Sequence, residues 1–152
     1  MEQAIISGVA HDRSEGKLTV RRVPDKPGVA ARVFTALADA NVNIDMIVQN
    51  VSAATTGLTD ISFTLPATDG QVGIAALTAV QGDIGFESLQ YDDTIGKLSL
   101  IGAGMRSHPG VSALLFRSLG EAGINIEMIS TSEIRISVVT EQARLDDAVR
   151  VI

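Results

Sequence analysis

The sequence has no cysteine among its 152 residues. This absence excludes disulfide bonds, thiolate catalysis and thiolate-bound metals. Aromatic residues are also scarce, at 3%, whereas hydrophobic residues in total make up 45% and charged residues 20%. A chain of this composition is expected to bury a core instead of remaining disordered, and that core has to be mainly aliphatic.

Positive charge and long apolar runs are lacking as well. The chain carries 12 Lys and Arg against 18 Asp and Glu, a net charge of −6, and it has no basic run. Nucleic acids and anionic membranes are therefore poor candidates for partners. No apolar run approaches the roughly 20 residues needed to cross a bilayer. The first residues include Glu2 and Asp12 instead of a basic and then apolar leader, so we expect a soluble, cytoplasmic protein.

What the sequence does contain is an internal repeat. Residues 25–50 and 107–132 align without a gap, and 11 of the 26 positions are identical. The shared skeleton is Pro-Gly-Val, then Phe, Leu and Ala at helical spacing, then Asn-Ile-x-Met-Ile. A repeat of this kind predicts two copies of one supersecondary unit.

Each copy begins with a helix start signal. Pro27 and Pro109 suit the first turn of a helix, where a missing N–H costs no hydrogen bond. Asp25 and Ser107 lie two residues earlier, where a short oxygen side chain can cap free helix N–H groups. An apolar stripe at helical spacing follows, and then the alternating pattern of a strand.

The order of the elements predicts the fold class, which is α+β with two ferredoxin-like βαββαβ modules. The first copy predicts strands over 17–23, 44–51, 58–65 and 85–91, and helices over 27–40 and 69–81. The second predicts strands over 97–102, 126–131 and 133–139, and helices over 109–122 and from about residue 141.

The second copy lacks its fourth strand, whereas residues 4–12 form a strand that belongs to no module. The economical solution is that this N-terminal strand completes the second module. The first module, residues 17–93, is then inserted into the second, which combines residues 1–16 with 94–152.

Catalytic and metal-binding patterns are weak. His11 and His108 lack further ligands at metal-binding spacing, and Asp92-Asp93 reads as a solvated turn. Residues 102–104, Gly-Ala-Gly, lack the third glycine of a dinucleotide-binding loop. We expect no catalytic residue, no metal and no cofactor.

The loop before each repeated helix suggests a binding site. A helix N-terminus offers unpaired N–H groups to a small carboxylate, and glycine lets a ligand approach the backbone. The segments 43–45 and 125–127, Asn-Ile followed by an acid, begin the next strand and are expected to face the loops as acceptors for an ammonium group. The alternative is that Pro-Gly only starts a helix and Asn-Ile only starts a strand, and spacing alone favours neither.

The motifs DKPGVA…NVNIDMIVQN, YDDTIGKLSLIGAGMRSHPGV and INIEMISTSEIRISV resemble the regulatory region of bacterial aspartate kinase over essentially the whole chain. The resemblance implies tandem ACT domains, the first inserted into the second. The chain starts at Met1 and has no kinase domain, which is similar to the separate regulatory β subunit of an α2β2 aspartokinase, a non-catalytic chain.

The resemblance also implies feedback inhibition of lysine, threonine and methionine biosynthesis, with threonine and/or lysine as effectors. The implied partners are a second copy of the chain, as a homodimer, and the aspartokinase α subunit. The alternative from another class is a stand-alone amino-acid-sensing module that serves another enzyme. A paired scaffold without a ligand and an independent enzyme rank below it.

Site residues follow from the resemblance as two sets, each combining the loop of one module with a segment of a partner chain. The expected threonine site comprises Asp25, Pro27, Gly28, Val29, Ala30 and Gln49, with Asn125 and Ile126 across the interface. The expected lysine site comprises Ser107, His108, Gly110, Val111 and Ser112, with Asn43, Ile44, Asp45 and Glu133 nearby.

Overall fold

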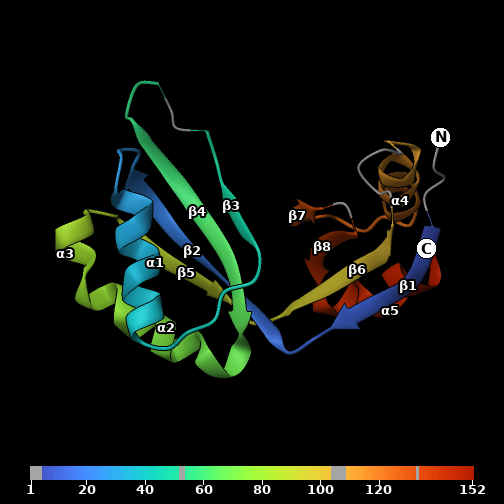
Figure 1. Cartoon of the computed structure of the whole chain (residues 1–152), viewed down its shortest axis with the longest axis horizontal. Coiled ribbons are helices and arrows are strands. Elements are labelled where there is room, and N and C mark those ends of the chain that lie inside the picture. The colour runs from blue at the N-terminus through green and yellow to red at the C-terminus, as the bar shows by residue number, and fades with distance from the viewer. Residues whose placement is uncertain (1–4, 52–53, 104–108, 133) are drawn as a thin grey trace. The chain divides into compact units, whose positions relative to one another are not determined.

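A computed structural model describes residues 5–51, 54–103, 109–132 and 134–152 (Figure 1). The chain divides into two compact units. One is Ser14–Asp93, and the other combines Met1–Arg13 with Thr94–Ile152. Within the described part of the chain, none of the helices combines the length and the apolar composition needed to cross a membrane.

The inserted unit has the predicted βαββαβ order. Its elements are β2 (Glu15–Pro24), α1 (Val29–Asp39), β3 (Ile47–Gln49), β4 (Leu58–Pro66), a 3-10 turn (Ala67–Asp69), α2 (Gly70–Ala79), α3 (Gln81–Ile84) and β5 (Ser88–Asp92). Its four strands form one antiparallel sheet in the order β3-β4-β2-β5. This is the ferredoxin-like arrangement, in which the first and third strands lie at the centre.

The core of this unit lies between the sheet and its helices. The 3.6-residue period of α1 buries Val33 and Leu37 completely. Gly73 of α2 lies close to Leu65 of β4 and to Leu37, so α1 and α2 cover the same face of the sheet. The cluster is mainly aliphatic, as the composition predicts, although Phe63 is fully buried at its centre.

The other unit completes its sheet with the N-terminal strand. Its elements are β1 (Ile5–Asp12), β6 (Ile95–Ala103), α4 (Pro109–Glu121), β7 (Met128–Thr131), β8 (Arg135–Glu141), a 3-10 turn (Gln142–Arg144) and α5 (Leu145–Arg150). The strand order is β1-β6-β8-β7, in which β1 takes the place that β5 has in the inserted unit. The predicted fold class is therefore confirmed, including the insertion of one module into the other.

The register of the two sheets repeats in detail. Asp12 of β1 pairs with Lys97 of β6, and Asp92 of β5 pairs with Lys17 of β2. The N-terminal strand thus corresponds residue by residue to the last strand of the inserted unit. In the unit that contains β1, the helices α4 and α5 bury an aliphatic cluster against the sheet, including Leu98, Leu115, Leu119, Val138 and Leu145.

Several predicted boundaries differ from the structure by two residues or more, among them the start of the strand predicted over 85–91, which is Ser88–Asp92. Two further elements differ in extent or continuity. The strand predicted over 44–51 narrows to Ile47–Gln49, because the Met46 N–H donates to the side-chain hydroxyl of Thr64 instead of to a ladder carbonyl. The helix predicted over 69–81 ends at Ala79 and a short helix restarts at Gln81.

The single tyrosine of the chain packs in a space that two glycines leave open. A methyl group at Gly16 or Gly70 would collide with the Tyr91 ring. The Tyr91 hydroxyl donates a hydrogen bond to the Ala67 carbonyl at 3.3 Å. Burial raises the pKa of the Tyr91 phenol, and the negative charges of Asp93 and Asp92 raise it further.

Because the chain has one tyrosine, this pKa can be measured directly. We predict that tyrosinate absorbance of the folded chain rises with a midpoint above the ordinary value of about 10. The folded state holds this proton more tightly than the unfolded state, so the contribution to stability is complete below about pH 10 and is lost as the pH rises through the folded pKa. In urea the midpoint should return to the ordinary value; a folded-state midpoint at or below it would contradict the described packing.

Candidate functional site

The loop before α1 is shaped by a left-handed glycine. Gly28 is the N-cap of the helix, with φ of 89°, and its carbonyl accepts the Arg32 N–H at 3.1 Å to close the first turn. Pro27 lies in the turn before the helix instead of in its first turn, so that prediction is wrong. Val29 and Ala30 begin the first turn. The Val29 N–H donates to the Lys26 carbonyl at 3.3 Å, and the N–H groups that follow in this turn have no partners within the helix.

Asp25 has a different role from the predicted one. Gly28 holds the N-cap position of α1, and in the described part of the chain no side chain makes a capping hydrogen bond to this helix. The expectation that Asp25 caps α1 is therefore wrong. The carboxylate of Asp25 instead accepts a hydrogen bond from the Gln49 side-chain amide at 3.4 Å. Its backbone N–H donates to the Gly57 carbonyl at 2.9 Å. The structure therefore brings Gln49, at the end of β3, together with Asp25, in the loop that ends at Gly28.

The segment 43–45 lies at the opposite end of α1. It follows the C-terminus of a helix of 11 residues, which spans about 16 Å. Asn43, Ile44 and Asp45 then lead into β3, and the Asp45 N–H donates to the Thr64 carbonyl at 3.0 Å. Strand order therefore separates this segment from the loop of its own module by the length of the helix. The expectation that the segment faces a loop can hold only for the loop of another module, and it stays a prediction.

The second copy repeats this separation but differs at the helix start. Here α4 begins at Pro109, as predicted, so that Gly110, Val111 and Ser112 belong to its first turn. Asn125 and Ile126 follow the other end of α4, beyond Gly123, whose φ is 73°. Ser107, His108 and Glu133 lie outside the described residues.

Comparison with known proteins shows the family to which the segments with these loops belong. The sequence model of the ACT domain matches residues 21–81 and 98–152, which contain both loops. The chain belongs to the ACT domain family. It is 58% identical to an aspartokinase of Mycolicibacterium smegmatis over 149 residues, which are 98% of this chain and 35% of that protein. It therefore spans about a third of the length of this relative.

Two solved structures match nearly the whole fold. One is a crystal structure of aspartokinase alpha and beta subunits, with a TM-score of 0.89 and 48% identity over 97% of this chain and 95% of that one. The other is the ligand-free regulatory subunit of aspartate kinase from Thermus thermophilus, with a TM-score of 0.90 and 37% identity over 96% of this chain and 95% of that one. The chain is thus a regulatory region of the aspartokinase type and not the catalytic part.

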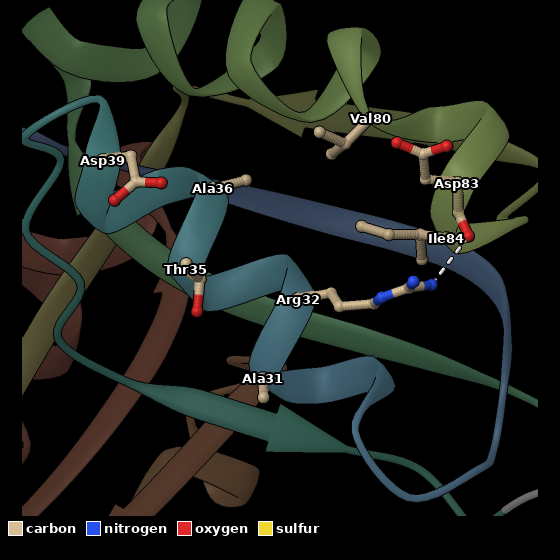
Figure 2. A pocket seen from close by; sticks show the side chains of 8 residues that line it. All are labelled: Ala31, Arg32, Thr35, Ala36, Asp39, Val80, Asp83 and Ile84. Carbon is tan, nitrogen blue, oxygen red and sulfur yellow. Dashed lines mark hydrogen bonds between the residues drawn. The ribbon is translucent and has the colours of Figure 1, made fainter.

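Three cavities in the described part of the chain are not lined by any predicted site residue. A cavity of about 320 Å³ lies between α1 and α3. Figure 2 shows its lining side chains, among them Arg32, whose guanidinium donates to the Asp83 carbonyl at 2.9 Å. None of the predicted site residues lines this cavity. A second hollow of about 420 Å³ lies beside the start of β4 and includes Asn50, next to Gln49, and Asp60. The loop residues Asp25, Pro27, Gly28 and Ala30 and the side chain of Gln49 are exposed.

Sequence reasoning missed two residues, Gly57 and Thr59, that form hydrogen bonds with Asp25 and with the neighbour of Gln49. Gly57 accepts the Asp25 N–H, and Thr59 donates from its hydroxyl to the Asn50 carbonyl. Thr59 is 4% exposed, which is unusual for a polar side chain next to a surface turn. The signal available in the sequence was the Thr-Gly turn at 56–57, which reads only as a hairpin connection.

The two equivalent glycines provide a matched test of this ACT geometry. An added methyl group would meet no atom within 4 Å at either Gly28 or Gly110, but only Gly28 has a positive φ. We predict that Gly28→Ala lowers the free energy of unfolding by about 1 kcal/mol, because alanine is strained at that φ. Gly110→Ala should leave it unchanged or raise it by up to about 1 kcal/mol, because alanine favours a helix. Urea denaturation measures both, and equal losses would contradict the different helix starts.

Proposed function

We propose that this chain is a regulatory subunit of aspartate kinase, acting in the cytoplasm, that binds threonine, lysine or both and transmits feedback inhibition to a catalytic α subunit. The observation that carries the proposal is the loop of the inserted module, in which an exposed helix N-terminus opened by Gly28 lies beside the Asp25–Gln49 pair. A free amino acid needs donors for its carboxylate and acceptors for its ammonium group, and this loop has both kinds.

Each group of threonine has a suitable partner here. The carboxylate fits the N–H groups at the start of α1, where the helix dipole also favours negative charge. Gln49 donates its side-chain N–H to Asp25, so its carbonyl oxygen remains available as an acceptor for the hydroxyl or ammonium group of the ligand. The Asp25 carboxylate balances the positive charge of the ammonium group.

One module offers only half of the contacts that this site requires. The Asn-Ile segments lie at the far ends of the helices, so a segment that faces the loop has to come from another module. We propose that Asn125 and Ile126 of a second copy complete the threonine site. A lysine site would use Gly110, Val111 and Ser112 with Asn43, Ile44 and Asp45 of that copy, and the acidic Asp45 suits an amine.

This arrangement explains how binding could regulate an enzyme. An effector shifts an equilibrium only by binding one arrangement better than another. If two chains each supply part of the site, the amino acid stabilises the docked arrangement of those chains. A coupling of about 1–3 kcal/mol for each effector is enough for strong inhibition when both are bound.

The decisive test is thermal melting of the chain with each of the twenty amino acids in excess. A ligand at about a hundred times its dissociation constant stabilises by roughly 2.7 kcal/mol, a rise of several degrees for a domain of this size. We expect the rise with threonine, with lysine, or with both. Asp25→Ala and Gln49→Ala should abolish the threonine response without unfolding the chain, because both side chains are exposed.

Gln71→Ala serves as the control, because Gln71 is an exposed glutamine of α2 outside the loop. A lysine response that persists in the Asp25 and Gln49 variants supports a separate lysine site. An unaltered threonine response in both variants would refute the site assignment. Melting with a purified catalytic subunit present tests whether that subunit is the partner.

A further inference from the structure

One residue of the central strand contacts both strands that lead to the Asp25–Gln49 pair. Asp60 lies in β4, between β3 and β2 in the sheet. Its backbone carbonyl accepts the N–H of Asn50, the neighbour of Gln49, at 3.1 Å. Its carboxylate accepts the backbone N–H of Arg22, three residues before Asp25, at 2.9 Å.

The contact to Arg22 holds an irregular point of β2. The register shifts between Val20, which pairs with Ile61, and Val23, which pairs with Thr59. Two residues of β2 therefore lie opposite Asp60 alone, which is the pattern of a β-bulge. Arg22 has φ of 55°, a conformation that side-chain-bearing residues adopt reluctantly and that persists only when the surroundings hold it.

The other contacts of Arg22 do not account for this conformation. Its side chain forms an ion pair with Glu87 at 3.0 Å, but both side chains are 54% exposed. An ion pair in that setting contributes little. The carboxylate of Asp60 is instead aimed at the backbone itself, and a hydrogen bond to a charged acceptor is stronger than one between neutral groups.

Beyond the bulge the chain runs directly into the loop. Pro24 pairs with Leu58, and the Asp25 N–H then donates to the Gly57 carbonyl. The angle at which β2 leaves the bulge therefore sets where the Asp25 carboxylate lies relative to Gln49. On the other side of β4, Asn50 is held by the Asp60 carbonyl.

In the second module the corresponding backbone N–H has a different kind of acceptor. Residues 16–20, Gly-Lys-Leu-Thr-Val, recur as residues 96–100, Gly-Lys-Leu-Ser-Leu, so that Gly102 stands at the position of Arg22. The Gly102 N–H donates to the backbone carbonyl of Ile134 at 2.8 Å, without a side-chain acceptor. The Asp60–Arg22 contact is thus a feature of the first loop and not of the fold in general.

We propose that Asp60 is a positioning residue for the effector loop of the first module: its carboxylate holds Arg22 in the left-handed conformation and so places Asp25 beside Gln49 for amino-acid binding. The claim about binding rests on the proposed function. The claim about the loop itself does not, because it concerns the chain without a ligand.

Three variants test the proposal against a merely structural role. Asp60→Ala removes the acceptor and should weaken threonine binding about tenfold, a loss of the size expected for one hydrogen bond to a charged group. Asp60→Asn keeps an acceptor oxygen at this position but not its charge, so its loss of affinity should be smaller than that of Asp60→Ala. Adding Arg22→Gly to Asp60→Ala should restore most of the affinity, because glycine adopts φ of 55° without steric cost.

The measurements are titration calorimetry with threonine and hydrogen exchange of the ligand-free chain. Exchange of the Asp25 amide should become faster in Asp60→Ala and return in the double variant. The Asn50 amide is the internal control, because its acceptor is the backbone of Asp60, which every variant keeps.

Unchanged affinity and unchanged Asp25 exchange in Asp60→Ala would overturn the proposal. Equal losses in the alanine and asparagine variants would also overturn it, because the acceptor would then not be what matters. If the unmodified chain binds no amino acid, the proposed function fails, and Asp25 exchange alone decides whether Asp60 positions the loop.

Discussion

The pairing of β1 with β6 is the constraint on which the architecture depends. It joins residues 5–12 near the N-terminus to residues 97–103, across the whole inserted unit. Closing so long a loop in a disordered chain is entropically costly. The inserted unit removes most of that cost once folded, because its first and last strands are neighbours and Lys17 pairs with Asp92. The chain therefore leaves the inserted sheet at two adjacent points, from which β1 and β6 can meet.

The same strand order determines what one module can offer a ligand. In a βαβ unit the helix carries the chain from one end of the sheet to the other before the next strand begins. The loop at Gly28 and the segment at Asn43 are consequently at opposite ends of α1, whereas Gln49, at the end of β3, returns to the loop. A module of this topology presents half-sites, and a ligand that needs both kinds of segment also needs a second module, which we propose belongs to a second chain. On the proposed function, this requirement is what couples binding to the docking of chains.

Most of the fold could be predicted from the sequence, because it follows from signals with a definite period. The gapless repeat indicated two copies of one unit, and the spare strand at the N-terminus together with the missing fourth strand indicated the insertion. The site was only partly predictable. The structure places Gln49 beside Asp25 of the loop, but the expected capping role of Asp25 was wrong, and the role of both residues in binding stays a prediction. Backbone angles such as that of Arg22, and the carboxylate that holds them, leave no periodic pattern, since any residue type can precede a bulge.

The two loops diverge although they share Pro-Gly-Val. Gly28 is a left-handed N-cap outside its helix, whereas Gly110 lies inside the first turn of α4. The difference costs the modules little stability, because their stability comes from buried apolar side chains. These are alike in both copies, as Leu37 and Leu119 show. The loops rest instead on a few polar contacts that can change without loss of the core. Duplication of an ACT domain therefore preserves the fold while it allows the two helix starts to differ. On the proposed function, this difference lets the two copies accept distinct effectors.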